Sequence, residues 1–225
     1  MNVTDRSHFL LTDQSQNAKL DAMGRRPLVE RGVALDRIMV RFWSHGYEAT
    51  SIDDLLDASG MHRGSFYRSF GDKHSAFVAA LTHYAEMVGE DHLVPALTGR
   101  GSPCRRLVRL LYARLDAALG ADDGARPGCL VVNTAVDVAP HDDQARAQVA
   151  TLLEAMRGAI HCLVDEAVVA GEVDGGVDRE LAADQIFALL QGVNVLTCAG
   201  ADGRELRRLL RRTVETTLRP TVSLP

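Results

Sequence analysis

The chain has 225 residues, of which 46% are hydrophobic, 24% charged and only 5% aromatic, a composition that excludes disordered and fibrous proteins. The formal net charge of −5 excludes a uniformly basic protein that coats nucleic acid. Apolar positions are mainly Ala, Leu and Val, and clusters of β-branched and aromatic residues are scarce, which favours an all-α fold.

The cysteines and the apolar stretches indicate a cytoplasmic protein. The cysteines form no CxxC pair and no signal peptide is evident, so a secreted disulfide framework is not expected. The most apolar stretch, residues 186–196, is interrupted by Gln191 and Asn194 and is shorter than the roughly 20 residues that a bilayer requires. We therefore expect no transmembrane segment and no membrane partner.

Helical spacing of apolar residues, bounded by caps and glycines, predicts about nine helices. Residues 1–23 show no such period and are expected to form a flexible tail. The first helix begins near Pro27, which suits a first helical turn, and Gly46 ends it. The expected helices span residues 27–46, 51–60, 62–69, 72–87, 102–119, 129–139, 142–170, 178–199 and 202–219.

Two short helices near the N-terminus form a helix-turn-helix pattern. Ser51 and Asp54 make a capping-box-like start, and Gly60 breaks the first helix after two turns. In the second helix Phe66 is expected to face inward, which leaves the polar side chains outside. Gly64 would let the backbone approach DNA closely. Residues 61–75 are also locally basic, with Arg63, Arg68 and Lys73 against Asp72.

At this point a family can be named. The stretch Phe42-Trp43-Ser44-His45-Gly46-Tyr47, then Thr50-Ser51-Ile52, then residues 63–73 (RGSFYRSFGDK) closely resembles the TetR family DNA-binding domain. The resemblance covers about residues 30–80. It implies a domain over residues 24–75 that reads DNA, followed over residues 76–220 by a helical domain for effector binding and dimerisation.

The resemblance also assigns expected roles by matching position. Thr50 and Ser51 would touch the DNA backbone at the start of the first helix of the motif. Arg63, Gly64 and Ser65 would lie in the major groove, and Tyr67 and Lys73 would grip phosphates. The second helix also exposes His62 and Arg68, but relatives often carry Ser or Thr where His62 stands, so base readout there is expected to differ.

Two structural alternatives stay open for this segment. The three helices can instead form a packing unit with solvated Arg and Tyr side chains. Arg25 and Arg26 can form a minor-groove arm or an ordinary solvated tail. An alternative from a different class of function is a degenerate enzyme or a protein-interaction module whose basic strip binds an acidic partner. Competition by plain duplex DNA that depends steeply on salt distinguishes a DNA-binding regulator from this alternative.

The helix from Asp178 is apolar around most of its circumference, which indicates burial on two sides and favours a homodimer over a monomer with a central helix. A dimer also matches two recognition helices to successive major grooves of a palindromic operator. The expected interface residues are Phe187, Leu190, Gly192, Val193, Leu196, Leu206 and Leu210.

Cys129 follows Pro127-Gly128 in the expected first turn of a short helix, where the helix dipole favours a thiolate. The stretch Gly128-Cys-Leu-Val-Val-Asn133 resembles a TetR subgroup that includes cysteine-based sensors of electrophiles or oxidants. The alternative is a small buried core cysteine. No catalytic motif is present, and His141-Asp142-Asp143 is better explained as a loop with a helix cap than as a metal site.

The sequence therefore predicts a ligand-responsive transcriptional regulator that is not an enzyme and needs no cofactor. Its expected partners are double-stranded DNA with a palindromic operator, a second copy of the chain and a small-molecule effector of unknown identity. The leading expectation is a repressor that the small molecule releases from DNA. The alternative within the same family is a redox or electrophile sensor that acts through Cys129.

Overall fold

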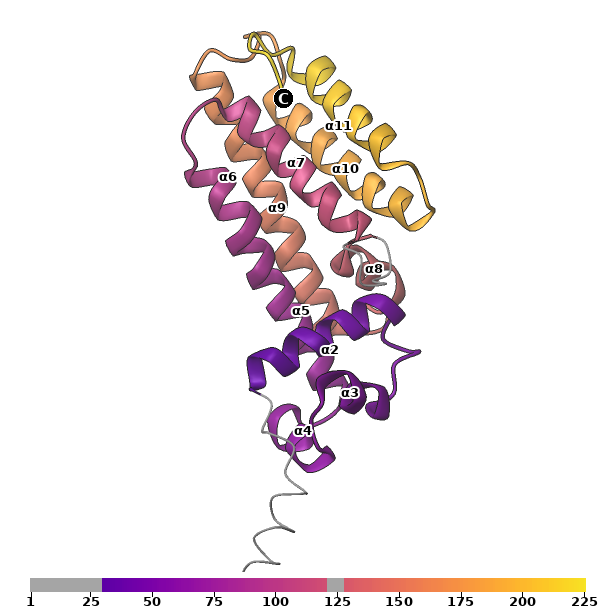
Figure 1. Cartoon of the computed structure of the whole chain (residues 1–225). Helices are drawn as coiled ribbons and strands as arrows, with labels where there is room; N and C mark the ends of the chain where they lie inside the picture. The colour runs from indigo at the N-terminus through magenta and orange to yellow at the C-terminus, as the bar shows by residue number, and fades with distance from the viewer. Residues whose placement is uncertain (1–29, 121–127) are drawn as a thin grey trace, which may run out of the picture.

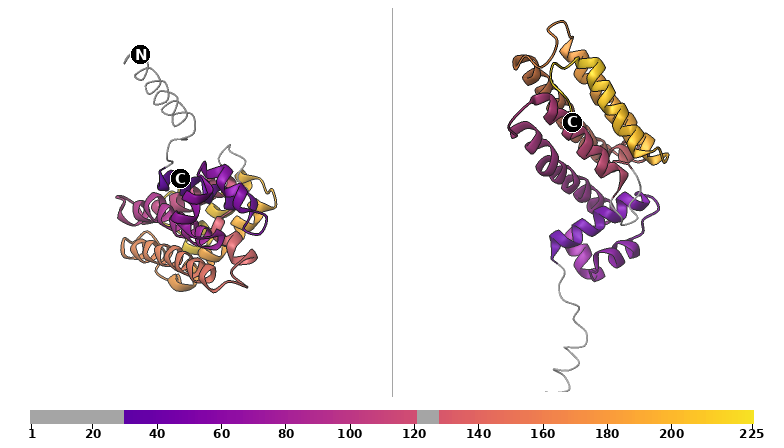
Figure 2. Two further views of the ribbon diagram at one scale, coloured as in Figure 1. Left: turned by 90° about the horizontal axis from the view of Figure 1, so that it is seen from below. Right: turned by 45° about the horizontal axis from the view of Figure 1, so that its top comes forward.

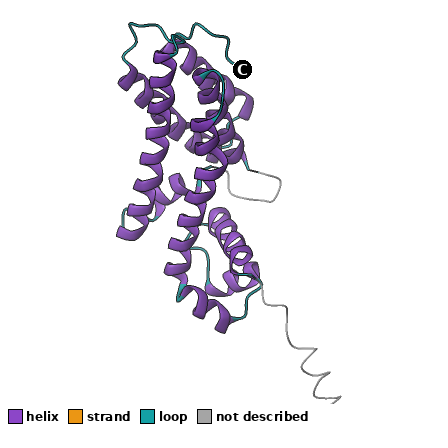
Figure 3. Ribbon diagram, turned by 90° about the vertical axis from the view of Figure 1, so that its left-hand side faces the viewer, coloured by secondary structure: helices purple, strands orange, loops and turns teal. Residues whose placement is uncertain are grey.

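The computed structural model describes residues 30–120 and 128–225, and within these ranges every element longer than an isolated bridge is a helix (Figure 3). The all-α prediction is confirmed. The segments α5, η1 and α6 follow one another without a break, so the expected set of helices is present, although the first begins at Arg31 and not near Pro27 as predicted. Their bounds are α2 Arg31–His45, α3 Ile52–Ser59, α4 Arg63–Phe70, α5 Lys73–Val88, η1 Gly89–Leu93, α6 Val94–Thr98, α7 Pro103–Leu119, α8 Leu130–Asp137, α9 Asp143–Val169, α10 Arg179–Cys198 and α11 Gly203–Leu218.

The molecule consists of a small head and a longer body (Figures 1 and 2). Helices α2, α3 and α4 form the head at one end, and α7, α9, α10 and α11 run lengthwise through the body. The predicted domain boundary at residue 75 falls inside α5, which packs against both α2 and α9. The predicted tail of residues 1–23, with Arg25, Arg26 and Pro127, lies outside the described residues.

The head folds as its local signals predict. Ser51 and Asp54 form a reciprocal capping box at the start of α3. Gly60 ends that helix with φ 72°, a left-handed conformation that favours glycine. A stripe of α2, including Ile38 and Phe42, is buried in the core, where α2 packs against α3 and α5. Packing in the core therefore fixes the position of α3 against α2.

The head is joined to the body by contacts on α5. The Phe42 ring of α2 meets the Phe77 ring edge-on at 5.0 Å between centroids. His83 Nε2 on α5 lies 2.5 Å from Asp36 Oδ1 on α2. His74 Nε2 at the start of α5 lies 2.5 Å from an oxygen of Asp142, which caps α9. Movement of α5 relative to the body would consequently move the head.

One described helix, α10, is long and apolar enough to pass a length-and-composition test for a membrane span, with a mean hydropathy of 1.3. The apolar stretch identified in the sequence, residues 186–196, is only part of this helix, which has 20 residues. In the structure α10 packs against α7, α9 and α11. Only 39% of the apolar segment of α10 is buried within the chain, so the rest of it is open in the single protomer.

Candidate nucleic-acid interface and effector region

Helix α4 has the orientation that a recognition helix requires. The Phe66 side chain is completely buried and Phe70 is 7% exposed, so both anchor α4 to the rest of the head. Tyr67 is 43% exposed, and Arg63 and Arg68 are exposed as well. The helix lies at the end of the molecule farthest from α11 (Figure 1). Nothing in the described body covers this outer face.

The two arginines of α4 are held only by weak surface contacts. Arg63 pairs with Asp53 of α3, and both side chains are more than half exposed. An Arg68 nitrogen lies 3.4 Å from the Ser65 hydroxyl. Exposed ion pairs contribute about 0–1 kcal/mol to the stability of the fold. Replacing these contacts with contacts to DNA would therefore cost little stability.

The first turn of α4 leaves an open surface. A Cβ added to Gly64 would meet no atom within 4 Å. His62 occupies the N-cap position and is exposed, and its side chain makes no capping hydrogen bond. The missing cap agrees with the expectation that imidazole is a poor N-cap. Ser65, which is half-buried, stands beside this open surface.

Thr50 and Ser51 differ in their access to DNA. The Thr50 side chain is fully buried, and its hydroxyl donates to the Gly46 carbonyl at 2.7 Å. The prediction that Thr50 touches the DNA backbone is therefore wrong for its side chain. Ser51 is exposed, with its hydroxyl engaged by Asp54 in the capping box. A hydroxyl in the sequence does not by itself reveal that it closes a turn.

Lys73 lies at the first residue of α5, where a positive charge opposes the helix dipole. Its Nζ is 4.3 Å from the centre of the Tyr47 ring, which holds the ammonium group beside α4. Asp72 caps the same helix by accepting from the Ser75 backbone N–H at 2.7 Å. A lysine at an unfavourable helix position is explained if it serves a ligand of negative charge.

The predicted dimer residues fall on two different faces of α10 and α11. Gly192 and Leu196 are exposed and Phe187 is half-buried, so they are available to a partner. For the other four the prediction is wrong, because each is at most 4% exposed within the single chain: Leu190, Val193, Leu206 and Leu210. The open apolar face instead contains Leu181, Ala188, Gly192, Val195, Leu196 and, on α11, Leu209.

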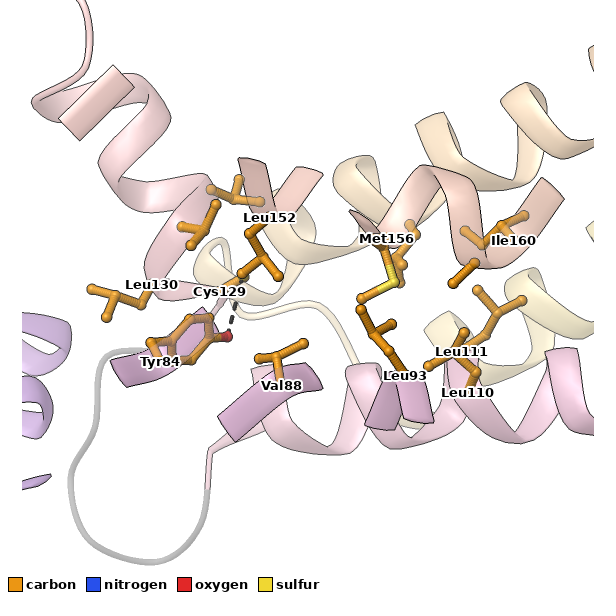
Figure 4. Packing of buried hydrophobic residues seen from close by; sticks show 14 of the residues in the cluster. Tyr84, Val88, Leu93, Leu110, Leu111, Cys129, Leu130, Leu152, Met156 and Ile160 are labelled. Atoms are coloured by element: carbon orange, nitrogen blue, oxygen red, sulfur yellow. Dashed lines mark hydrogen bonds between the residues drawn. The ribbon is translucent and has the colours of Figure 1, made fainter. Parts of the chain in front are cut away.

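Cys129 is the N-cap residue of α8, one position before the expected first turn, and is 6% exposed. Figure 4 shows the hydrogen bond between its Sγ and the Tyr84 hydroxyl, which are 3.3 Å apart, and the Sγ also lies 3.8 Å from an Arg114 nitrogen. Sequence reasoning missed Tyr84 and Arg114 as members of this cluster. A lone Arg on a helix ordinarily indicates a solvent-facing position, whereas Arg114 is 3% exposed.

The acidic pair after His141 has a structural role. Asp142 caps α9 by accepting from the Ala145 N–H at 2.8 Å and also pairs with His74. These hydrogen bonds, that from Ala145 first, keep the pKa of Asp142 below its ordinary value. Within the described ranges no group of three or more His, Cys, Asp or Glu side chains is placed to hold a metal ion.

Comparison with known proteins agrees with this architecture. Residues 35–80 match the model of bacterial regulatory proteins of the tetR family, and residues 103–213 match that of the tetracyclin repressor-like C-terminal domain. The chain is 26% identical to the HTH-type transcriptional repressor ComR of Escherichia coli, over 91% of this chain and 96% of ComR. It is 28% identical to the transcriptional regulator AcuR of Cereibacter sphaeroides, over 65% and 66% of the two chains.

A solved structure of the TetR family regulator CifR, a cysteine mutant in complex with a 26-base-pair operator DNA, superposes with a TM-score of 0.74 at 25% identity. The match covers 86% of this chain and all of the CifR chain. The two family models together span most of the described residues. The chain belongs to the TetR family, whose members are non-enzymatic regulators of transcription that bind operator DNA.

Proposed function

We propose that the protein is a repressor that binds a palindromic operator as a homodimer and is released by a small molecule. The observation that carries this proposal is the orientation of α4, with Phe66 inward and Arg63, Tyr67 and Arg68 outward. In that arrangement Arg63, Gly64 and Ser65 enter the major groove, with His62 at the start of the helix. Ser51, Tyr67 and Lys73 contact phosphates. The name of ComR, a repressor, supports the direction of control.

The dimer would form through the open face of α10 and α11. Leu181, Ala188, Gly192 and Val195 follow one another at spacings of seven, four and three residues along α10, which places them on one face, and all are exposed in the single chain. Such a stripe matches the packing of one helix against another. Two-fold pairing here would place two α4 helices at one end of the assembly, where successive major grooves lie about 34–36 Å apart.

Release requires that the effector bind the DNA-incompetent state more tightly than the competent one. The body would bind the effector, and α5 would carry the change to the head through its contacts with Phe42 and Asp36. The protein would act in the cytoplasm, where its operator is accessible.

The decisive experiment selects bound sequences from a library of random duplexes with the full-length protein. We expect an inverted repeat whose half-sites are one helical turn, or a multiple of it, apart. An Arg63→Ala variant should relax the base preference in each half-site, whereas Lys73→Ala should weaken all sequences alike. Recovery of a single asymmetric site, or of no preferred sequence, would reject the proposal.

A second candidate is a thiol sensor, favoured by the contacts of the Cys129 Sγ with both the Tyr84 hydroxyl and the Arg114 guanidinium. Loss of operator binding after brief treatment with N-ethylmaleimide would support it if Cys129→Ser abolishes the effect. Cys162→Ser, which removes an exposed thiol, is the matched control. An unaltered response in Cys129→Ser would end this candidate.

A further inference from the structure

Arg114 is a buried cation without a matching anion. The side chain is 3% exposed, and one guanidinium nitrogen, Nη2, donates to the Tyr84 hydroxyl at 2.8 Å. The other nitrogen, Nη1, is buried and has no hydrogen-bond partner. Among the ion pairs of residues 30–120 and 128–225, none includes Arg114.

The other buried arginine of α7, Arg106, has the carboxylate partner that Arg114 lacks. Arg106, two turns earlier on α7 and similarly buried, pairs with Glu166 and donates to the Ala96 and Leu97 carbonyls, and only its Nε is buried without a hydrogen-bond partner. A buried guanidinium without such partners destabilises a folded chain, because its lost hydration is not replaced. The contrast between the two arginines indicates that the second partner of Arg114 is not part of the protomer's own described structure.

The groups around Arg114 are suited to an anion. Its near polar neighbours are the Tyr84 phenol and the Cys129 thiol, and the positive charge of Arg114 also acts on His92. Burial, and then the charge of Arg114, lowers the pKa of His92. Apolar side chains such as Val88 and Leu152 lie beside Tyr84 and Cys129 (Figure 4). A carboxylate there would meet donors, and a hydrocarbon group would meet the apolar wall.

A cleft of about 170 Å³ lies beside this part of the body, although Arg114 itself does not line it. Its wall includes Leu110 and Ala113 of α7, the residues one turn before and next to Arg114. The other lining residues are Asp91, His92, Pro95, Ala96, Arg106 and Arg109. The η1 segment is a π-helical turn, an irregularity that occurs frequently at functional sites. The cleft brings solvent to within about one helical turn of the buried guanidinium.

We propose that Arg114 binds the carboxylate of a small organic acid, which is the effector class of this protein. The Nη1 donor and the Tyr84 hydroxyl would bind the carboxylate oxygens, and the apolar side chains would hold the rest of the molecule. This inference rests on the proposed function, since it names the ligand to which the repressor responds. It requires no covalent step at Cys129.

The same cluster is connected to the head by Trp43 of α2. Trp43 Nε1 donates to the Gly128 carbonyl at 3.1 Å, next to Cys129 in the chain. The Trp43 ring meets the Tyr84 ring edge-on at 5.4 Å between centroids. A carboxylate that moves Tyr84 or the residues before α8 would therefore displace α2. Trp43 is also the single tryptophan of the chain, so its fluorescence reports on this cluster.

The test is a titration of full-length protein, without DNA, monitored by Trp43 fluorescence. Sodium benzoate is the probe and benzamide, a neutral molecule of nearly equal shape, is its control. We expect a saturable change with benzoate and at least a tenfold weaker response with benzamide. Arg114→Met should abolish the benzoate response, whereas Arg105→Met, an exposed arginine at the other end of α7, should retain it.

The wild-type comparison decides the question even if Arg114→Met fails to fold. Equal responses to benzoate and benzamide, no saturable response to benzoate, or an unchanged benzoate response in a folded Arg114→Met protein would overturn the proposal. Tyr84→Phe gives a second variant and should weaken benzoate binding several-fold while leaving Arg114 in place. Operator binding, measured separately, distinguishes the two levels of inference. If benzoate binds but does not release the DNA, the anion site is supported and release by the ligand is rejected. If only uncharged molecules release the DNA, release is supported and the anion site is rejected.

Discussion

Replacement of Lys73 by Gln tests the phosphate contact assigned to the start of α5. A dimer carries two copies of Lys73, so the substitution removes two phosphate contacts from each complex. Because log K falls with log salt at a slope of about −0.9 per neutralised phosphate, the slope should become shallower by about 1.8. Over a fourfold rise in salt concentration, the affinity gap between wild type and variant should narrow by about tenfold.

The same substitution should leave the fold intact. Loss of the cation–π contact with Tyr47 costs about 0.5–1 kcal/mol. Removal of a positive charge from the first turn of α5 recovers about 0.3–1 kcal/mol through the helix dipole. These opposing terms nearly cancel, so the melting temperature of Lys73→Gln should stay close to that of wild type.

The assay is fluorescence anisotropy of a labelled duplex from the selected sequences, at four or more salt concentrations. Arg105→Gln is the matched control, because this exposed arginine donates to the Ser223 carbonyl at the end of the body away from the head. A slope unchanged in Lys73→Gln, or reduced equally in Arg105→Gln, would refute the phosphate assignment.

Three further predictions concern other parts of the molecule. Gly64→Ala should stabilise α4 by about 0.5–1 kcal/mol in a denaturant melt, because Ala is the better helix former and no atom obstructs its Cβ. It should also weaken operator binding, and unaltered affinity would argue against close backbone approach. Val195→Arg should give a folded monomer in sedimentation, whereas Leu190→Arg, placed in the core, should unfold the chain; a Val195→Arg dimer would exclude this face as the interface. Hydrogen bonds from Arg157, and next from His161, lower the pKa of Asp184 to about 2, so its contribution to stability is present above its ordinary pKa and is lost as pH falls toward 2. Asp184→Asn should therefore make stability less dependent on pH between the ordinary pKa of an aspartate and about pH 2. If the acid denaturation curve is the same as that of wild type, the contacts of Asp184 with Arg157 and His161 do not contribute to stability.

The sequence was sufficient to predict the helices and the orientation of α4, because their signals are local. The capping box at Ser51 depends on neighbours within a few residues, and so does the glycine that ends α3. The inward position of Phe66 follows from helical spacing once the two short helices are recognised. Roles that depend on one residue and its own helix were therefore predictable.

The predictions that were wrong depend on packing between distant segments. Leu190 and Leu196 are equally apolar on α10, and the sequence does not tell which one is buried and which is exposed. Thr50 resembles a DNA-contacting residue until the fold brings its hydroxyl to the Gly46 carbonyl. Arg114 has no local signal at all, because only the meeting of α5, α7 and α8 buries it.

The π turn at Gly89–Leu93 makes this the place where the chain can lose one residue without rotating α6. Each residue advances an α-helix by about 100°, and a π turn accommodates one more residue than an α turn. Deletion of Glu90 would allow α5 and α6 to merge into one regular helix, while the residues beyond the deletion keep their present faces. A one-codon deletion at this point would therefore reshape the wall of the cleft at the π turn without rotating α6 or touching the DNA-reading surface.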